Sequence, residues 1–174
     1  MLNNIFILTG PVQSGKTTML MDFMTGKGHA GGFLCPDIGG KRFYLPLNER
    51  ILIPFQVDEN YSGVKVAVGK FTFSASVFDK ARSMLDGYQP NSNEWFILDE
   101  IGKLEVSGLG LEPSLTKFIN NFKNQQADHT KLIIVVRDYL LKEVVEKYQI
   151  QDRTILKEIT GSSLSFIEHP GLKD

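Results

Sequence analysis

The sequence is poor in cysteine, since Cys35 is the only one among 174 residues. A single cysteine forms no intrachain disulfide, and a cysteine-rich metal site is excluded. Long apolar runs are missing as well, because no stretch approaches the roughly 18 apolar residues of a membrane-spanning helix. The first residues also lack the charged region and long apolar run of a signal peptide. We therefore expect a soluble, cytoplasmic protein.

An excess of charge of one sign is also absent. The 19 Lys and Arg residues balance 20 Asp and Glu residues, and no basic run reaches five residues. A large electrostatic footprint for nucleic acid is therefore not expected. The length is near that of one domain, and 42% hydrophobic residues are typical of a globular chain. We expect a monomer that folds as a single domain over residues 1–174.

The most informative stretch lies near the start, where an apolar run at residues 5–8 leads into Gly10. Gly15, Lys16 and Thr17 follow, which completes the pattern G-x-x-x-x-G-K-[ST] of a phosphate-binding loop. Its glycines allow backbone conformations that a side chain disfavours. Main-chain amides can then converge on an anion at a helix N-terminus. The pattern predicts binding of a nucleoside triphosphate with Mg²⁺.

Two side chains of this loop have specific expected roles. Lys16 places a positive charge near the β- and γ-phosphates, and the Thr17 hydroxyl is placed to hold Mg²⁺. The expected nucleotide-binding residues are Gly10, Pro11, Val12, Gln13, Ser14, Gly15, Lys16, Thr17 and Thr18.

A second polar group follows the apolar run at residues 95–98, where Asp99 and Glu100 stand next to each other. Ligands bind outside the carboxyl ends of strands in an open parallel sheet, so we expect both carboxylates beside the phosphate-binding loop. Adjacent strand residues point to opposite faces, which favours different roles for the two. Asp99 would order the hydration shell of Mg²⁺, and Glu100 would orient or deprotonate the attacking water. The alternative is a solvated pair at a strand end.

Strand and helix patterns alternate along most of the chain. Apolar runs predict strands at residues 5–8, 31–35, 95–98, 131–136 and 153–159. Amphipathic patterns predict helices at residues 16–25, 74–85, 112–123, 139–147 and 162–168. The alternation predicts an α/β fold with a mostly parallel sheet flanked by helices. Within residues 41–74, short apolar stretches separated by turn residues predict a β-rich insert of antiparallel hairpins.

Two segments together resemble the cancer-related and thermophile nucleoside-triphosphatase family. They are residues 10–18, G-P-V-Q-S-G-K-T-T, and residues 99–105, D-E-I-G-K-L-E, of which Asp-Glu-Ile-Gly-Lys is the distinctive part. The order of elements extends the likeness over most of the chain. The resemblance implies a P-loop fold with a RecA-like core, and Mg²⁺-dependent hydrolysis of several nucleoside triphosphates to diphosphates. Residues 34–40 depart from the family, which usually has more polar and acidic residues before the Gly-Gly turn.

Arg137 and Lys103 each have two interpretations. Arg137 would face the nucleotide if its strand lies beside the phosphate-loop strand, and would then stabilise charge on the transferring phosphoryl group. Alternatively, it pairs with Asp138 or another carboxylate. Lys103 either reaches the phosphates or fixes the loop that carries Asp99.

Three further positions have weaker signals. Asp37 follows a strand beside glycines and is expected to form a turn, although a kinase would use such a residue as an acceptor base. Cys35 is expected to be a small buried residue rather than a nucleophile. Residues 160–162 follow the last expected strand, and this position would place them against the base of the nucleotide.

Three functions remain open from the sequence. The first hypothesis is a nucleoside-triphosphatase that hydrolyses ATP, GTP or another triphosphate, with Glu100, Lys16 and Arg137 as catalytic residues and Thr17 and Asp99 as metal ligands. A small-molecule or nucleotide kinase needs the same loop and an acceptor pocket, which the insert would have to supply. Its cations are dispersed along the insert, which counts against a kinase lid. The third hypothesis is a nucleotide-gated switch that binds a partner.

Overall fold

The computed structural model describes residues 4–27, 29–124 and 129–157. The expected helix at 162–168, the loop at 160–162 and residues 158–159 of the last expected strand lie outside the described residues. The helices are α1 (Lys16–Met24), α2 (Ala75–Asp86), α3 (Lys103–Val106), α4 (Ser114–Asn124) and α5 (Leu141–Tyr148), with a 3-10 turn at Asp138–Leu140. The strands are β1 (Ile5–Gly10), β2 (Ala30–Leu34), β3 (Asp37–Ile38), β4 (Lys41–Pro46), β5 (Ile53–Pro54), β6 (Lys65–Val68), β7 (Phe71–Ser74), β8 (Trp95–Ile101), β9 (Lys131–Arg137) and β10 (Thr154–Leu156).

The central sheet has the strand order β10-β1-β9-β8-β2-β4-β3, with β5 paired to β4. Strands β10, β1, β9, β8 and β2 run parallel to one another, whereas β4 runs antiparallel to β2. The strand that ends in the acidic pair, β8, is thus separated from the phosphate-loop strand, β1, by β9 alone. Their carboxyl ends meet at one edge of the sheet, where a ligand of an open parallel sheet binds.

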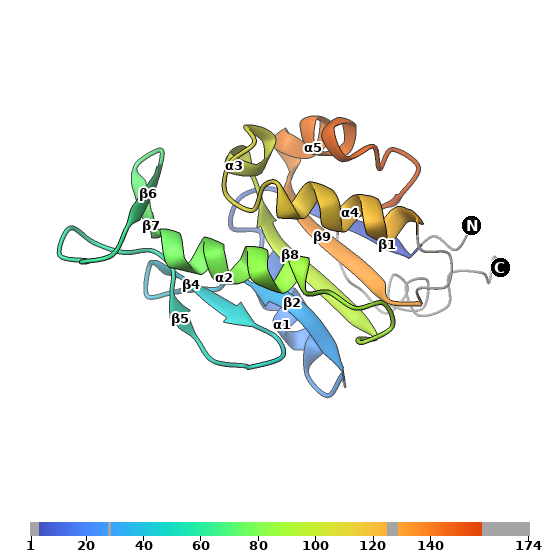
Figure 1. Ribbon diagram of the computed structural model, residues 1–174, viewed down its shortest axis with the longest axis horizontal. Coiled ribbons are helices and arrows are strands. Elements are labelled where there is room, and N and C mark those ends of the chain that lie inside the picture. Colours follow the sequence, from blue (N-terminus) through green and yellow to red (C-terminus); the bar gives the residue numbers. More distant parts are fainter. Residues whose placement is uncertain (1–3, 28, 125–128, 158–174) are drawn as a thin grey trace.

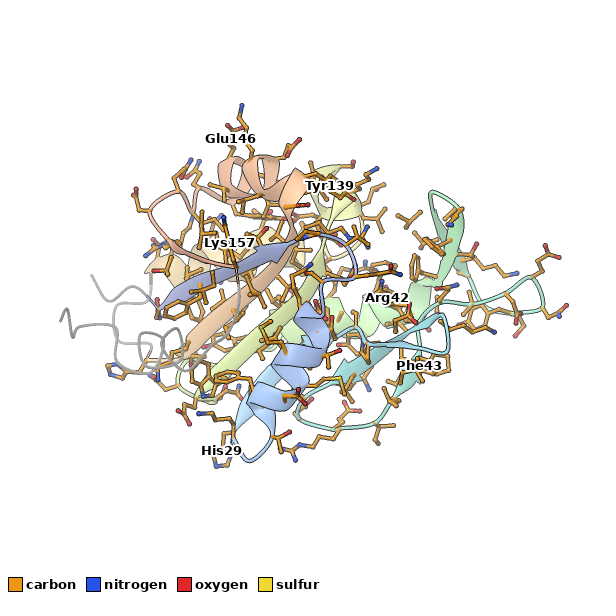
Figure 2. All side chains as sticks on the ribbon, turned by 180° about the vertical axis from the view of Figure 1, so that it is seen from behind. His29, Arg42, Phe43, Tyr139, Glu146 and Lys157 are labelled. Carbon is orange, nitrogen blue, oxygen red and sulfur yellow. The ribbon has the colours of Figure 1, made fainter. Side chains whose placement is uncertain are left out.

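Helices cover both faces of this sheet, and alternate strand residues enter two separate cores. Ile5 and Ile7 of β1 pack with α2, α4 and α5, whereas Phe6 and Leu8 pack with Leu20 of α1. Figure 1 shows α2 and α4 across the near face, and α1 lies in front of the sheet in the reverse view of Figure 2. A strand that is buried on both faces has apolar residues at successive positions, so it can be recognised in the sequence as a continuous apolar run.

The expected α/β fold with a mostly parallel sheet is confirmed, and the main strands and helices lie where their patterns predict. Two details differ. The short helix α3 after the acidic pair was not predicted, since four residues carry too little periodicity. Helix α2 begins one residue later than predicted, at Ala75, and the hydroxyl of the preceding Ser74 bonds the hydroxyls of Tyr61 and Ser76 rather than the helix backbone.

The β-rich segment of residues 41–74 has two parts. Strands β4 and β5 extend the edge of the central sheet with β3, whereas β6 and β7 form a separate antiparallel hairpin. Figure 1 shows this hairpin projecting beyond the sheet at the start of α2. Phe55 joins the two parts to the body, because its ring lies 4.7 Å from Phe73 and 5.0 Å from Phe78 of α2. The expected antiparallel pairing is confirmed.

No helix within the described residues is both long and apolar enough to cross a lipid bilayer.

Candidate nucleotide site

The loop between β1 and α1 enters the left-handed backbone region at one of its two glycines and at Gln13. Gly15 has φ +82° and Gln13 has φ 61°, so the chain passes twice through the left-handed region before α1 begins at Lys16. The first amides of a helix have no partner within it, and the dipole at this end favours an anion. One amide of the expected cradle is already used, since Ser14 N donates to Pro11 O at 3.3 Å.

Lys16 is folded back over its own loop. Its Nζ donates to Gly10 O at 3.0 Å, to Pro11 O at 2.6 Å and to Ser14 Oγ at 3.1 Å. These three oxygens hold the ammonium group against the loop. The remaining expected residues Pro11, Val12, Gln13 and Thr18 are exposed.

Asp99 links the two sequence motifs. Its Oδ2 accepts hydrogen bonds from Thr17 Oγ1 at 2.8 Å and from Cys35 N at 2.9 Å. The residue is 2% exposed. Burial, with the nearby charge of Glu100 as a smaller cause, raises the pKa of Asp99 to about 6. A carboxylate that is costly to ionise in this position is a natural partner for a cation.

The donor set fits Mg²⁺. Magnesium prefers oxygen ligands and is commonly held by one or two carboxylates together with substrate phosphates and water. Thr17 and Asp99 supply a hydroxyl and one buried carboxylate, and no ion pair among the described residues involves Asp99. The described part of the chain holds no group of three or more His, Cys, Asp or Glu side chains of the kind that binds a metal without substrate.

Glu100 is placed differently from its neighbour. It has φ 63°, and the pairing of β8 with β9 shifts register between Leu98 and Ile101. This irregularity turns the Glu100 side chain toward two arginines. Arg42 Nη1 donates to Oε1 at 2.9 Å, and Arg137 Nη2 donates to Oε2 at 3.0 Å. The Glu100 side chain keeps 29% of its surface exposed. It is therefore not the freely solvated carboxylate of the alternative interpretation.

Arg137 meets the geometric condition set by the sequence. Its strand, β9, lies directly beside β1, and Arg137 pairs in register with Gly10 of the phosphate-binding loop. The guanidinium nevertheless bonds a carboxylate, that of Glu100 rather than Asp138, and Nη1 donates to the Tyr139 hydroxyl at 3.3 Å. Arg137 thus adjoins the loop and is ion-paired with a carboxylate, and its role in stabilising a phosphoryl group stays a prediction.

The sequence did not assign Arg42 to the site. In the sequence it is one of the dispersed cations of the insert, whereas in the fold β4 carries its guanidinium to Glu100. The only signal was its position just after the Gly39-Gly40 turn, and this turn brings β4 back past the end of β2. Asp37 forms that turn as expected, since its Oδ1 accepts from Gly40 N at 2.9 Å.

The loop after the acidic pair is held by Glu105, to which no role had been assigned. This carboxylate is 4% exposed and accepts from Gly102 N at 3.0 Å and Leu111 N at 3.2 Å. Burial raises its pKa.

Lys103 is exposed on this loop, with Nζ 5.8 Å from the centre of the Tyr139 ring. Cys35 is buried as expected, and burial raises the pKa of its thiol, which disfavours a nucleophilic thiolate.

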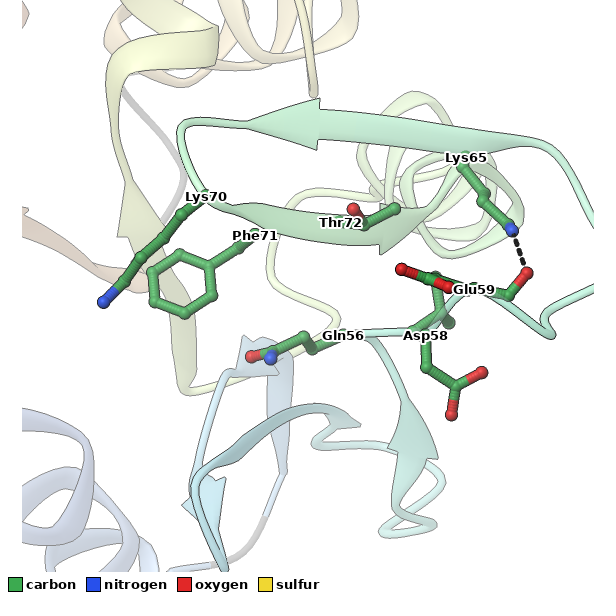
Figure 3. Close-up of a pocket in the computed structure, with 8 residues that line it drawn as sticks. Gln56, Asp58, Glu59, Lys65, Lys70, Phe71 and Thr72 are labelled. Atoms are coloured by element: carbon green, nitrogen blue, oxygen red, sulfur yellow. Dashed lines mark hydrogen bonds between the residues drawn. The ribbon is translucent and has the colours of Figure 1, made fainter.

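A hollow of about 270 Å³ lies on the insert (Figure 3). Its lining combines charged, polar and aromatic side chains: Gln56, Asp58, Glu59, Lys65, Lys70 and Phe71, with Val57 and Thr72. Lys65 Nζ donates to Glu59 O at 2.7 Å, and Lys70 lies over the Phe71 ring. Gln56 Oε1 accepts from the amide of Arg42 at 3.4 Å, so the hollow adjoins the strand that reaches Glu100.

Two solved structures share this fold. THEP1 from the hyperthermophile Aquifex aeolicus matches 95% of this chain and 96% of its own, with a TM-score of 0.67 and 16% identity. The solution structure of a human cancer-related nucleoside triphosphatase matches 97% of this chain and 95% of its own, with a TM-score of 0.60 and 16% identity. No family model and no curated protein sequence matches the chain. The expected resemblance is confirmed at the level of the fold.

Proposed function

We propose that the chain is a Mg²⁺-dependent nucleoside-triphosphatase that converts a nucleoside triphosphate and water into a diphosphate and phosphate, with broad tolerance of the base. The hydrogen bond from Thr17 to Asp99 carries the proposal, because it joins the phosphate-binding loop to the acidic strand end. Glu100 and Arg137 adjoin this contact. The name of the human fold neighbour, a nucleoside triphosphatase, supports the same reaction. Base tolerance rests on the motif resemblance.

The residues of the loop bind the triphosphate. Helix α1 begins at Lys16, so its first amides and its dipole favour the phosphate oxygens. Lys16 exchanges its contacts with Gly10, Pro11 and Ser14 for contacts with the β- and γ-phosphates. Thr17 and Asp99 would hold Mg²⁺, which when bound neutralises charge on the phosphate oxygens.

Glu100 acts on the water. Its carboxylate orients a water molecule toward the γ-phosphorus and accepts a proton as the new phosphorus–oxygen bond forms. The bond from the γ-phosphorus to the bridging oxygen breaks, and the diphosphate leaves with that oxygen. Arg137 stabilises the charge spread over the transferring phosphoryl group. Positioning and electrostatics account for most of such a reaction, because the phosphoryl group needs little covalent help.

A phosphate-release assay over ATP, GTP, CTP and UTP, each with Mg²⁺ and with excess EDTA, tests the proposal. We expect free phosphate from several triphosphates in the presence of Mg²⁺ and a loss of release with EDTA. An Asp99→Asn variant provides the matched control for the metal site, because it removes the carboxylate charge while the shape of the side chain stays nearly the same. Absence of release from all four triphosphates would reject the hydrolase. Tight binding with very slow release would favour the nucleotide-gated switch.

The hollow on the insert favours a kinase as the second candidate. It has the polar lining of a small acceptor site and adjoins Arg42. Lys65 and Lys70 are the cations of its lining, and Lys65 is engaged with the backbone of Glu59. A kinase transfers the phosphoryl group to an acceptor, so phosphate release without any added acceptor separates the two reactions. Release at the same rate with and without candidate acceptors would leave the hydrolase as the explanation.

A further inference from the structure

Arg42 lies where the insert meets the catalytic edge of the sheet (Figure 2). Strand β4 pairs with β3 through Arg42 and Asp37, and with β2 further along. The arginine therefore comes from the insert, whereas Lys16, Asp99, Glu100 and Arg137 come from the parallel strands or the loops that follow them.

The Arg42 guanidinium bonds Glu100 directly and is linked to Asp99 only through the backbone of Cys35. Its Nη1 donates to Glu100 Oε1 at 2.9 Å and also to Cys35 O at 3.1 Å. The amide of Cys35 in turn donates to Asp99. A continuous set of hydrogen bonds thus runs from the phosphate-binding loop through Thr17 and Asp99 to Cys35, Arg42 and Glu100.

The two arginines on Glu100 are held unequally. Arg42 has a second anchor on a backbone carbonyl, and its side chain is 21% exposed. Among the described residues, the other acceptor of Arg137 is the exposed Tyr139 hydroxyl, at 3.3 Å, and the Arg137 side chain is 33% exposed. Arg137 also adjoins the phosphate-binding loop through its pairing with Gly10. A triphosphate would draw Arg137 away more readily than Arg42.

We propose that Arg42 is a positioning residue, which holds the Glu100 carboxylate in its orientation toward the attacking water once Arg137 has turned to the transferring phosphoryl group. This inference rests on the proposed hydrolysis. Glu100 stands at a backbone irregularity with φ 63°, where the regular pairing of β8 with β9 is interrupted. A base that is misplaced by about 1 Å can lose about 10² in rate, which is why its orientation needs a second support.

The test compares Arg42→Gln with Arg50→Gln, a change of another arginine of the insert that is exposed. We expect Arg42→Gln to lower kcat by about 10- to 100-fold while the dissociation constant for the triphosphate stays within about threefold. Arg50→Gln leaves both unchanged. Arg42→Lys restores part of the rate, because a lysine keeps the charge but lacks the planar fork. Melting temperatures of all three variants check the fold, and Arg42→Lys carries the test if Arg42→Gln does not fold.

A second arm asks whether Arg42 acts through Glu100. In a Glu100→Ala background, Arg42→Gln should cause no further loss in single-turnover rate, whereas Arg137→Gln should still lower it. Three results would overturn the inference while hydrolysis stands. They are an equal loss of kcat and triphosphate affinity in Arg42→Gln, a rate of Arg42→Gln like that of Arg50→Gln, and an additive loss of rate in the Glu100→Ala background. If the unchanged protein released no phosphate, that result would overturn the proposed function and this inference with it.

Discussion

The two sides of the candidate site differ in how completely water is excluded. On the side of the phosphate-binding loop, Asp99 is 2% exposed and its contacts are one hydroxyl and one backbone amide. On the other side, Arg42, Glu100 and Arg137 keep 21%, 29% and 33% of their side-chain surface exposed. The buried Asp99 carboxylate is held by two short hydrogen bonds, whereas the other side consists of long side chains that can rearrange.

This difference suggests a division of labour between binding and turnover. Long charged side chains at a partly exposed position change partners at low cost, because water screens and replaces the lost contacts. A buried carboxylate has no such freedom. The loop side is therefore suited to hold phosphate and Mg²⁺ in place, and the arginine side to change its ion pairs during the reaction.

The largest expected effect comes from the exposed side. Glu100→Gln should lower kcat by about 10²- to 10⁴-fold, because an amide accepts no proton from the attacking water. Triphosphate affinity, measured by calorimetry, should change little. An unchanged hydrolysis rate would show that Glu100 has no catalytic role, and a large loss of affinity would break the proposed division between the two sides.

The loop side should respond in the opposite way. Lys16→Ala removes a charge-assisted contact to the phosphates, so triphosphate affinity should fall by about 10- to 100-fold. The exposed Lys117 of α4 offers a control with the same change of charge through Lys117→Ala. A dissociation constant that stays the same in Lys16→Ala would reject the loop as a phosphate cradle.

The smallest expected effect is a pH dependence of stability in the Mg²⁺-free protein. Asp99 has a pKa of about 6 in the folded chain and near 3.8 when unfolded, so the folded state binds more protons between these values. The free energy of unfolding should therefore fall as pH rises from about 4 to about 6, by on the order of 1 kcal/mol after relaxation of the site.

Thermal melts in EDTA over this pH range measure the slope of stability against pH. Asp99→Asn should flatten it, because the amide does not titrate. Added Mg²⁺ should raise the melting temperature more above pH 6 than below it, since the cation competes with the proton. An equal slope in the unchanged protein and in Asp99→Asn would show that the buried carboxyl is not its source.

Much of the fold could be predicted because its signals are local or periodic. The parallel strands are buried on both faces, so β8 and β9 appear as unbroken apolar runs, and the stripe of α2 has a helical period. The shortest elements could not be predicted, because they contain too few residues to show a periodic pattern. Helix α3 is one turn long, and β5 has two residues.

The sequence by itself determined the phosphate-binding loop, because Gly10, Gly15, Lys16 and Thr17 are neighbours whose joint geometry depends on a single turn. It also supplied the acidic pair at the end of β8. Only the tertiary structure decided that β9 lies between these two motifs and that Arg42 reaches Glu100 from the insert. Strand order and ion pairs join residues far apart in the chain, and no local pattern records which charges will meet after folding.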